Sequence, residues 1–566
     1  MTISWEQVVQ RHVDDADVQQ LMSEGMSSVL ARVYAARGVR RTAQLTHDLS
    51  GMLHFNTLLQ IDDMAARLAD AVTCQLNVVV VADYDADGAT ACAVAVRGLA
   101  LMGLTVQFFV PNRFIHGYGL TPEVVGIVAQ QQPAIIITVD NGIASVDGVE
   151  AARQLGIEVL VTDHHLPGEH LPQAIIVNPN QLNCTFSSKH LAGVGVMFYV
   201  LLATRAHLQT RGYFVNRALP NMAQLLDLVA LGTVADVVKL DENNRILVEQ
   251  GLRRMRQGHA CAGITALFAV AGRAMERATA IDLGFMIGPR LNAAGRLEDM
   301  SLGIHCLLTD DQQHAAEMAQ RLHELNAERR EIEGDMQEQA LAAMPDLHCV
   351  TSSSVVLFDE VWHAGVIGIL ASRLKDRYHR PTICFARGQA GEIKGSGRSI
   401  SGLHLRDALD WVTKQRPGLI HRFGGHAAAA GLSLEESRFK EFVHWFELAA
   451  QRMLTEYDLQ RVIQTDGVLD EQDLSVDLAQ SIHQQVWGQG FPMPCFAGEW
   501  RVVQQRVLKE RHLKLKLAHG KQDLDAILFN YAQPMPEFIR GVYQLDLNTY
   551  NGNTRMQLRL QDWCAA

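Results

Sequence analysis

Residues 77–180 alternate short apolar runs with stretches of helical periodicity. The runs are rich in valine and isoleucine, and they lie at 77–83, 105–111, 134–140, 157–163 and 174–179. β-Branched runs separated by helices are typical of βαβ units, whose parallel strands are buried on both faces. The pattern therefore predicts a parallel α/β sheet in this part of the chain.

The periodicity changes after this region. Residues 190–275 look largely helical, and residues 310–344 read as one long charged helix with few apolar positions, which favours a helix that bridges two domains. Two apolar runs and a Gly-rich segment then predict a second α/β domain to about residue 455. From about residue 460 on, strands with a period of two and the turn signal "NGN" predict a small β barrel or sandwich.

A chain of 566 residues is too long for one core. We expect five parts: an N-terminal helical extension over 1–48, a catalytic domain over 49–309, a connecting helix over 310–345, a second α/β domain over 346–455 and a β barrel over 456–566.

Composition narrows the class of protein. The nine cysteines contain no CxxC pair, which indicates a reducing compartment. The N-terminus lacks a basic and apolar leader, and there is no stretch of 18 apolar residues. We therefore expect a cytoplasmic protein that does not span a membrane.

The net charge of −12 does not by itself suggest nucleic acid. However, residues 371–398 hold seven lysines and arginines against two acids, and residues 501–516 hold six against one. These two basic segments could follow a phosphate backbone, or they could simply be solvated faces.

Acidic residues follow three of the predicted strands, in "VVVVADYDADG", "IIITVDNG" and "VLVTDHH". In an open parallel sheet the ligand site lies beyond the carboxyl ends of the strands. We therefore expect one group of side chains to converge there: Asp83, Asp85, Asp140, Asp163, His164 and His165. Carboxylates with imidazole suit Mg²⁺ or Mn²⁺, and a pair of such ions can hold the attacking and leaving oxygens of a phosphoryl displacement.

A fourth segment, "LLDLVALGTVADVV" (225–238), places Asp227 and Asp236 among apolar residues, where an acid needs a partner or a metal.

Each motif alone has a simpler interpretation. "DADG" could be an Asx turn or part of a calcium loop, "DHH" a helix cap, and Asp227 a local cap. The conjunction of all four in one βαβ series favours a metal site.

These four segments, in this order, resemble the motifs of the DHH phosphoesterase superfamily. Three later stretches are more specific: "IGPRLNAAGRL" (287–297), "WHAGVIGILASRLKDRYHRPTICF" (362–385), and "GSGRSI" (395–400) with "FGGHAAAAGL" (423–432). They resemble the RecJ exonucleases, from about residue 45 to the C-terminus. The resemblance implies a DHH catalytic domain, a DHH-associated domain and a C-terminal OB-fold. It also implies a processive nuclease that degrades single-stranded DNA from its 5′ end in recombination and repair, with Mg²⁺ or Mn²⁺ as two ions.

The resemblance also implies roles for the acidic positions. Asp83, Asp85, Asp140, His164 and Asp236 would be metal ligands, and Asp87, like Asp227, would be a further ligand or support the ligands from behind. His165 would face the scissile phosphate, and Asp163 would orient a histidine. One departure is Val79, which stands where many small-molecule members of the superfamily have a histidine, so the division of ligands between two ions stays open.

A second group of residues would handle the strand. "GSGRS" is expected to be a Gly-rich loop, with Ser396 and Arg398 on the 5′-terminal phosphate, although a flexible turn is the simpler interpretation. Tyr118 could stack on a base or belong to the core. Arg290 and Arg296 are candidates for contacts with the phosphate backbone of the strand. The resemblance places Gly424, Gly425 and His426 on a loop that faces the substrate.

The expected partner is single-stranded DNA with a free 5′ end. The resemblance adds single-strand-binding protein and a RecQ-type helicase, and we expect a monomer. Two alternatives remain at this point. One is a non-catalytic nucleic-acid-binding replication scaffold, which the intact carboxylates and histidines disfavour. The other is a small-substrate phosphodiesterase acting on oligonucleotides or cyclic dinucleotides, which would need neither the long helix nor the barrel.

Overall fold

The computed structural model describes residues 4–344, 352–388, 391–520, 522–550 and 553–566. The chain forms two compact units, Met1–Glu324 with Gln464–Ala566, and Leu325–Ile463. The second unit is thus inserted into the sequence of the first.

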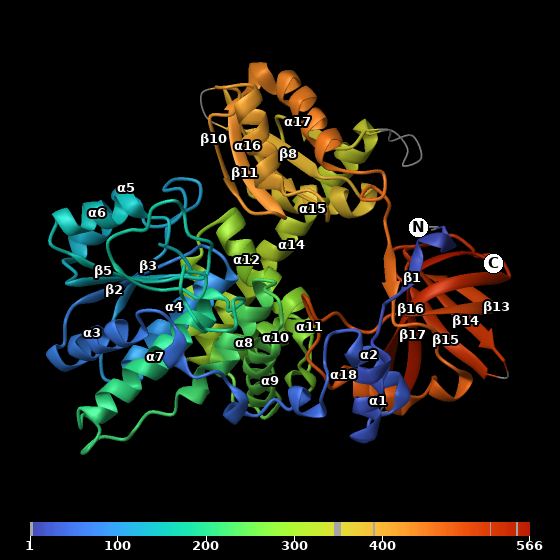
Figure 1. The fold of residues 1–566 in the computed structure, drawn as a ribbon, viewed down its shortest axis with the longest axis horizontal. Coiled ribbons are helices and arrows are strands. Elements are labelled where there is room, and N and C mark those ends of the chain that lie inside the picture. Colours follow the sequence, from blue (N-terminus) through green and yellow to red (C-terminus); the bar gives the residue numbers. More distant parts are fainter. Residues whose placement is uncertain (1–3, 345–351, 389–390, 521, 551–552) are drawn as a thin grey trace. The chain divides into compact units, whose positions relative to one another are not determined.

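A five-stranded parallel sheet forms one end of the first unit (Figure 1). Its order is β3-β2-β4-β5-β6, with bounds Gln107–Phe109, Val78–Ala82, Ile135–Val139, Glu158–Thr162 and Ile175–Val177. Every residue of β2 and β4 is buried. This confirms the sheet that the β-branched runs predict.

Helices cover both faces of this sheet, which is why its central strands are apolar throughout. α5 (Pro122–Val128) and α6 (Val146–Gln154) pack on one face through a cluster that includes Val79, Val125 and Ile136. α3 (Ile61–Cys74), α4 (Ala86–Leu101) and α7 (Gly193–Thr210) lie on the opposite side (Figure 1). The carboxyl edge of the sheet stays open to carry side chains.

The rest of the first unit up to residue 324 is helical. It contains α8 (Leu226–Ala235), α9 (Glu242–Arg256), α10 (Ala262–Val270), α11 (Ala280–Asp282), a π-helical turn over Leu283–Ile287, α12 (Gly288–Leu297) and α13 (Ser301–Leu308). The long helix α14 spans Gln312–Ala343, as the charge pattern predicts. Among the described residues no helix is long and apolar enough to cross a membrane.

The N-terminal residues pack against the chain just before the barrel. They form β1 (Val8–Gln10), α1 (Asp15–Ser23) and α2 (Ser28–Ala35), and β1 pairs with β12 (Ile463–Thr465). Arg37 and Asp466 make a buried ion pair with an Nη1–Oδ1 distance of 2.7 Å. Tyr34 stacks on Trp487 with ring centroids 5.7 Å apart, so this segment packs against the residues that lead into the barrel.

The C-terminal residues form a closed five-stranded barrel of order β13-β14-β15-β17-β16. The strands are Phe496–Leu508, His512–His519, Gln522–Leu528, Asn553–Ala565 and Phe538–Tyr550, and α18 (Val476–His483) packs against β16. β15 and β17 are parallel and the other neighbours are antiparallel. The barrel is the one that the period-two pattern predicts.

The second unit is a smaller α/β structure. Its sheet has the order β10-β11-β9-β8-β7, with bounds Arg422–Gly425, Ala429–Glu435, Glu392–Arg398, Thr382–Arg387 and Val355–Phe358. α16 (Leu405–Gln415) and α17 (Phe439–Met453) pack on one face around Phe385, Phe442 and Leu434, and α15 (Ile367–Tyr378) packs against β8 and β9.

The "GSGRS" prediction of a loop is wrong, because residues 395–398 lie inside strand β9. β9 pairs with β8 on one side and with β11 on the other. The backbone N–H groups of this stretch therefore belong to the sheet ladder and cannot form a phosphate nest. Only the side chains of Ser396 and Arg398 remain for ligand contacts.

Candidate metal centre

The acidic motifs meet at the carboxyl edge of the parallel sheet. Asp83 and Asp85 follow β2, Asp140 follows β4, His164 follows β5, and Asp236 lies directly after α8. Their ligand atoms fall into three overlapping groups, each within 4.8 Å: Asp83, Asp85 and Asp140; Asp87, His164 and Asp236; and Asp140, His164 and His165.

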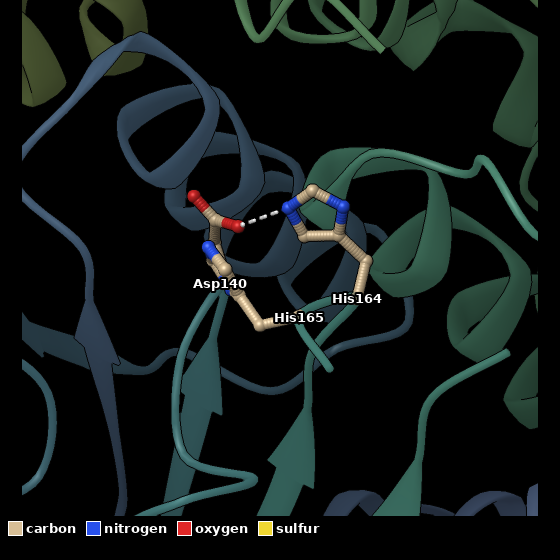
Figure 2. Close-up of side chains that lie close together, drawn as sticks. All are labelled: Asp140, His164 and His165. Atoms are coloured by element: carbon tan, nitrogen blue, oxygen red, sulfur yellow. Dashed lines mark ion pairs between the residues drawn. The ribbon is translucent and has the colours of Figure 1, made fainter. Parts of the chain in front are cut away.

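Asp140 and His164 each belong to two of these groups and so connect all three. Figure 2 shows their side chains pointing toward one another, and His164 Nε2 lies 3.1 Å from Asp140 Oδ1. The same nitrogen is 3.5 Å from Asp236 Oδ2 and 3.9 Å from Asp87 Oδ2. Asp140 Oδ1 and His164 Nε2 are buried and make no hydrogen bond within the described residues. Buried polar atoms without such bonds are costly, and a divalent cation between them would satisfy both.

The chain strains its backbone to build this site. Asp140 has a φ of 62°, in the left-handed region that non-glycine residues adopt rarely. A Cβ on Gly193 would lie 2.6 Å from the Asp140 side chain, so the start of α7 must be glycine there. The conformation turns the Asp140 carboxylate toward His164.

Asp87 has a double role in the geometry. Its carboxylate accepts the N–H groups of Gly193 and Val194, at 2.6 and 2.9 Å, at the N-terminal end of α7. It also faces His164. We expected Asp87 either to bind metal or to support the ligands from behind, and the structure places it in one of the three groups.

Burial and mutual repulsion make the carboxylates hard to ionise without cations. Burial, with Asp236 next to it, raises the pKa of Asp87 to about 7, and burial, with Asp85 next to it, raises that of Asp236 to about 8. The same two causes raise the pKa of Asp140 and of Asp83. Burial lowers the pKa of His164 and leaves its imidazole neutral, which is the form that binds a metal. This donor set fits Mg²⁺ or Mn²⁺.

Asp163 and His165 form a separate pair beside the cluster. The His165 Nδ1 atom is 2.8 Å from Asp163 Oδ1, and Asp163 also accepts the N–H groups of His164, His165 and Ile143. Burial opposes protonation of His165, but the hydrogen bond to Asp163 outweighs it and raises the pKa of His165 to about 9. Burial likewise opposes ionisation of Asp163, yet the His165 interaction holds its pKa below the usual value. The pairing with Asp163 therefore favours the protonated form of His165.

Tyr118 lies next to His165. Its hydroxyl is 3.4 Å from His165 Nδ1, and its ring meets the rings of His165 and Tyr84 edge to face. Tyr118 is 49% exposed, which excludes the core interpretation of this residue. Arg113 stacks over Tyr84 at 4.3 Å, so cationic and aromatic groups line one side of the centre.

Asp227 does not join the cluster. Its Oδ2 accepts the N–H of Cys261, the residue that caps α10, at 2.8 Å. Asp227 lies in the first turn of α8 and Asp236 directly after its last residue, so the helix separates them by roughly 13 Å along its axis. Asp227 therefore caps the start of α10, 34 residues further along the chain, rather than making a local contact.

The two arginines of "GPRLNAAGR" lie on α12. Gly295 of this helix packs directly on the Tyr84 carbonyl, since a Cβ at this position would lie 2.0 Å from the carbonyl oxygen. The Asn292 side chain accepts the N–H of Ala86 at 2.9 Å. α12 thus supports the Asp83–Asp87 segment. Arg290 is buried and donates to His323 Nδ1, with Nε at 3.2 Å, whereas Arg296 is half-buried in the last turn.

Ser396 and Arg398 share one face of β9 in the second unit. Arg398 Nη1 lies 3.2 Å from Ser396 Oγ. A Cβ on Gly368, at the start of α15, would lie 2.8 Å from Ser396 Oγ and 3.0 Å from Arg398 Nη2. Burial lowers the pKa of Arg398, and it forms no ion pair with a carboxylate among the described residues. A guanidinium, a hydroxyl and a helix N-terminus together suit an anion.

Gly424, Gly425 and His426 lie at the edge of the same sheet. Gly425 has a φ of 143° and a Cβ there would lie 2.4 Å from the Ala429 carbonyl, so this turn requires glycine. The N–H of His426 donates to that carbonyl at 2.7 Å.

Several residues that position the site carry no signal in the sequence. Asn180 and Asn178 donate to the carbonyls of His164 and His165, and the Asn141 side chain donates to Val139 and Val81. Their roles depend on neighbours that only the folded sheet provides.

The basic segment 501–516 is less cationic than its sequence indicates. Lys514 and Lys516 on β14 face Asp525 and Asp523 on β15, each at 3.3 Å. The register of the two strands thus neutralises these lysines.

Comparison with known proteins gives the family. The DHH family N-terminal domain matches residues 77–233, the DHHA1 domain 350–452 and the RecJ OB domain 465–562. The single-stranded-DNA-specific exonucleases RecJ of Dickeya dadantii and Escherichia coli are 47% and 46% identical. These alignments cover 95% and 98% of this chain and 96% and 98% of those proteins.

Solved structures agree with this assignment. The crystal structure of RecJ from Thermus thermophilus in complex with Mn²⁺ matches with a TM-score of 0.83 and 29% identity, over 100% of this chain and 80% of that one. The same protein in complex with Mg²⁺ matches with a TM-score of 0.78. The chain belongs to the RecJ family of DHH proteins.

Proposed function

We propose that this chain is an exonuclease that removes nucleotides from the 5′ end of single-stranded DNA in recombination and repair, using Mg²⁺ or Mn²⁺. The observation that carries the proposal is the contact between Asp140 Oδ1 and His164 Nε2, because each residue also belongs to a further group of candidate ligands. The names of the relatives and the Mn²⁺ and Mg²⁺ complexes of the Thermus protein support it.

The residues divide naturally between two cations. Asp83, Asp85 and Asp140 would hold one, and Asp87, Asp236 and His164 the other, with Asp140 close enough to serve both. When bound, such ions activate a water molecule and offset charge on the phosphate. The chain itself supplies preorganised ligands, so no side chain has to act as a nucleophile.

His165 would stabilise charge at the scissile phosphate. Its Nδ1 lies 2.8 Å from Asp163 Oδ1, and its Nε2, 3.5 Å from the Tyr118 hydroxyl, would donate to a phosphate oxygen. Tyr118, beside it and half exposed, would stack on the base of the nucleotide being removed.

Recognition of the 5′ end would fall to the second unit. Arg398 and Ser396 present a guanidinium and a hydroxyl to one anion, and a terminal phosphate carries more charge than an internal one. The strand backbone would be contacted by Arg290, Arg296, Gly424, Gly425 and His426.

The remaining expectations are also proposals: the domain boundaries given above, a monomer in the cytoplasm, and partners such as single-strand-binding protein and a RecQ-type helicase.

The direct test is digestion of a long single strand labelled at either its 5′ or its 3′ end, with and without Mn²⁺. We expect the 5′ label to be released first as mononucleotide, only with the metal, and a blunt duplex to resist. Early release of a 3′ label would refute the polarity. Strand binding without metal-dependent cleavage would favour the scaffold alternative.

A further inference from the structure

One face of the sheet in the second unit is only partly covered. On this face α15 packs against β8 and β9, while α16 and α17 pack on the opposite face. Beyond α15, on β11 and β10, Gly431, Gly424 and Arg422 are all exposed. This bare area adjoins Ser396, because the strand register places Gly431 directly opposite Ser396 and Gly424 opposite Gly431.

Neither backbone conformation nor packing requires the two glycines. Both lie inside strands and outside the left-handed region. A Cβ on Gly424 would have no atom of the described residues within 4 Å, and one on Gly431 would meet only the Gly395 carbonyl oxygen, at 3.9 Å. A glycine inside a strand weakens it and often marks a place where a ligand approaches closely. The pair therefore leaves room for a ligand next to Ser396.

Two cationic side chains flank this room. Lys394 lies two residues before Ser396 on β9, and the register aligns Lys394, Ser433 and Arg422 in one row across the sheet. Lys394 and Arg422 are exposed, and within the described ranges neither forms an ion pair with a carboxylate. Both line two adjoining hollows of about 500 and about 320 Å³, which also share Ser433.

One carboxylate, that of Glu392, lies in the same area. The hydrogen bond from Ser433 outweighs partial burial and, with His421 and Lys394 nearby, holds the pKa of Glu392 below its usual value. The Glu392 Oε1 atom is also 3.6 Å from His421 Nδ1. This carboxylate is therefore already engaged by its neighbours. Two cations against one engaged carboxylate leave a surplus of positive charge that suits phosphate groups.

The room over the glycines is continuous with the anion site of Ser396 and Arg398. Ser396, Gly431 and Gly424 form a row across three strands that is about 10 Å long, and the row of Lys394 runs about 7 Å from it. The long side chains of lysine and arginine can cover that distance. A phosphate held by Ser396 therefore has open sheet on one side, with two cations beside it.

We propose that this face is a subsite for the additional phosphates of 5′-di- and triphosphorylated single strands. The first phosphate stays on Ser396 and Arg398, and the others lie over the two glycines between Lys394 and Arg422. Water then attacks the phosphorus between the first and second nucleotides, the bond to the 3′ oxygen breaks, and that oxygen takes a proton. The products are a nucleoside di- or triphosphate and a strand with a new 5′-phosphate. This assignment rests on the proposed function and extends its substrate class.

The test uses the double variant Lys394→Gln with Arg422→Gln. Its matched control is Arg406→Gln with Lys440→Gln, because these cations are exposed on α16 and α17, which pack on the opposite face of the sheet. The substrates are DNA single strands of one sequence with a 5′-hydroxyl, a 5′-phosphate or a 5′-triphosphate. Affinity is measured in EDTA, and single-turnover cleavage in Mn²⁺ with chromatography of the released nucleotide. Thermal unfolding of each variant verifies that it is folded.

We expect wild type to bind the triphosphorylated strand at least as tightly as the monophosphorylated one and to release a nucleoside triphosphate from it. The double variant should lower affinity and rate with the triphosphorylated strand roughly 10-fold. It should treat the monophosphorylated strand as wild type does, and the control should match wild type with every strand. Gly431→Val adds a side chain that suits a strand and fills the room, so it should impair the triphosphorylated substrate more than the monophosphorylated one.

Three results would overturn the proposal. The first is a triphosphorylated strand that wild type binds and cleaves no better than the 5′-hydroxyl strand. The second is a double variant that behaves like its control, or that loses equally with both phosphorylated strands. The third is release of a nucleoside monophosphate from the triphosphorylated end. Failure of wild type to cleave the monophosphorylated strand in Mn²⁺ would instead sink the proposed function, and the affinities in EDTA would still decide the subsite.

Discussion

Lowering the pH should weaken metal binding steeply, because the ligands must lose protons before they can coordinate. Without cations Asp87 has a pKa of about 7 and Asp236 of about 8. For two such groups, the fraction of protein with both ionised is roughly one half at about pH 8 and roughly one in a thousand at about pH 6. The apparent affinity for Mn²⁺ at their site should therefore fall by roughly 100- to 1,000-fold over this range.

The assay is calorimetric titration of metal-free protein with Mn²⁺ at both pH values, in two buffers that differ in ionisation enthalpy. The difference between buffers counts the protons released, which should be more than one per ion at about pH 7. Asp236→Asn removes one titrating ligand, so it should bind more weakly at high pH and show a flatter pH dependence. The surface variant Asp147→Asn is the control, since Asp147 is exposed on α6. An affinity that changes less than about tenfold would refute the account of a carboxylate cluster that is protonated without metal.

Three further results are expected. Metal-free Asp140→Asn should unfold at a higher temperature than metal-free wild type at about pH 8, and the two should unfold at similar temperatures in acid. The reason is that the pKa of Asp140 is raised in the folded state, so the stability of wild type falls as the pH rises above the unfolded-state pKa of this group. Equal unfolding temperatures at about pH 8 would contradict this explanation. Arg398→Gln should lose a preference of roughly 10- to 150-fold for 5′-phosphorylated over 5′-hydroxyl ends in single-turnover cleavage, with Mn²⁺ binding unchanged. Lys514→Gln should leave the salt dependence of strand binding unchanged, because Asp525 already neutralises this lysine; a slope reduced by about 0.7 would place the strand on β14.

The sequence predicts the sheet and its open edge well because both depend on local pattern. The β-branched runs become β2, β4 and β5, and the acids that follow them meet because parallel strands end at the same edge. The period-two strands likewise become the closed barrel.

Other features depend on partners that are distant in sequence. "GSGRS" looks like a turn, yet β8 and β11 recruit it into a strand. Asp227 and Asp236 occur in one apolar run, but helix rise separates them, and only Asp236 reaches His164. The neutralisation of Lys514 depends on strand register, which the local sequence does not determine. The five domain boundaries stay predictions.

The most direct test of the metal centre is single-turnover release of the first nucleotide from a 5′-phosphorylated single strand in Mn²⁺ by Asp140→Asn, with Asp147→Asn as the matched control. Asp140 lies in two of the three ligand groups and 3.1 Å from His164, so its amide should remove a shared ligand. We predict that Asp140→Asn falls to the rate of the buffer blank while the folded control cleaves like wild type. Cleavage by Asp140→Asn at a rate near that of the control would contradict the account.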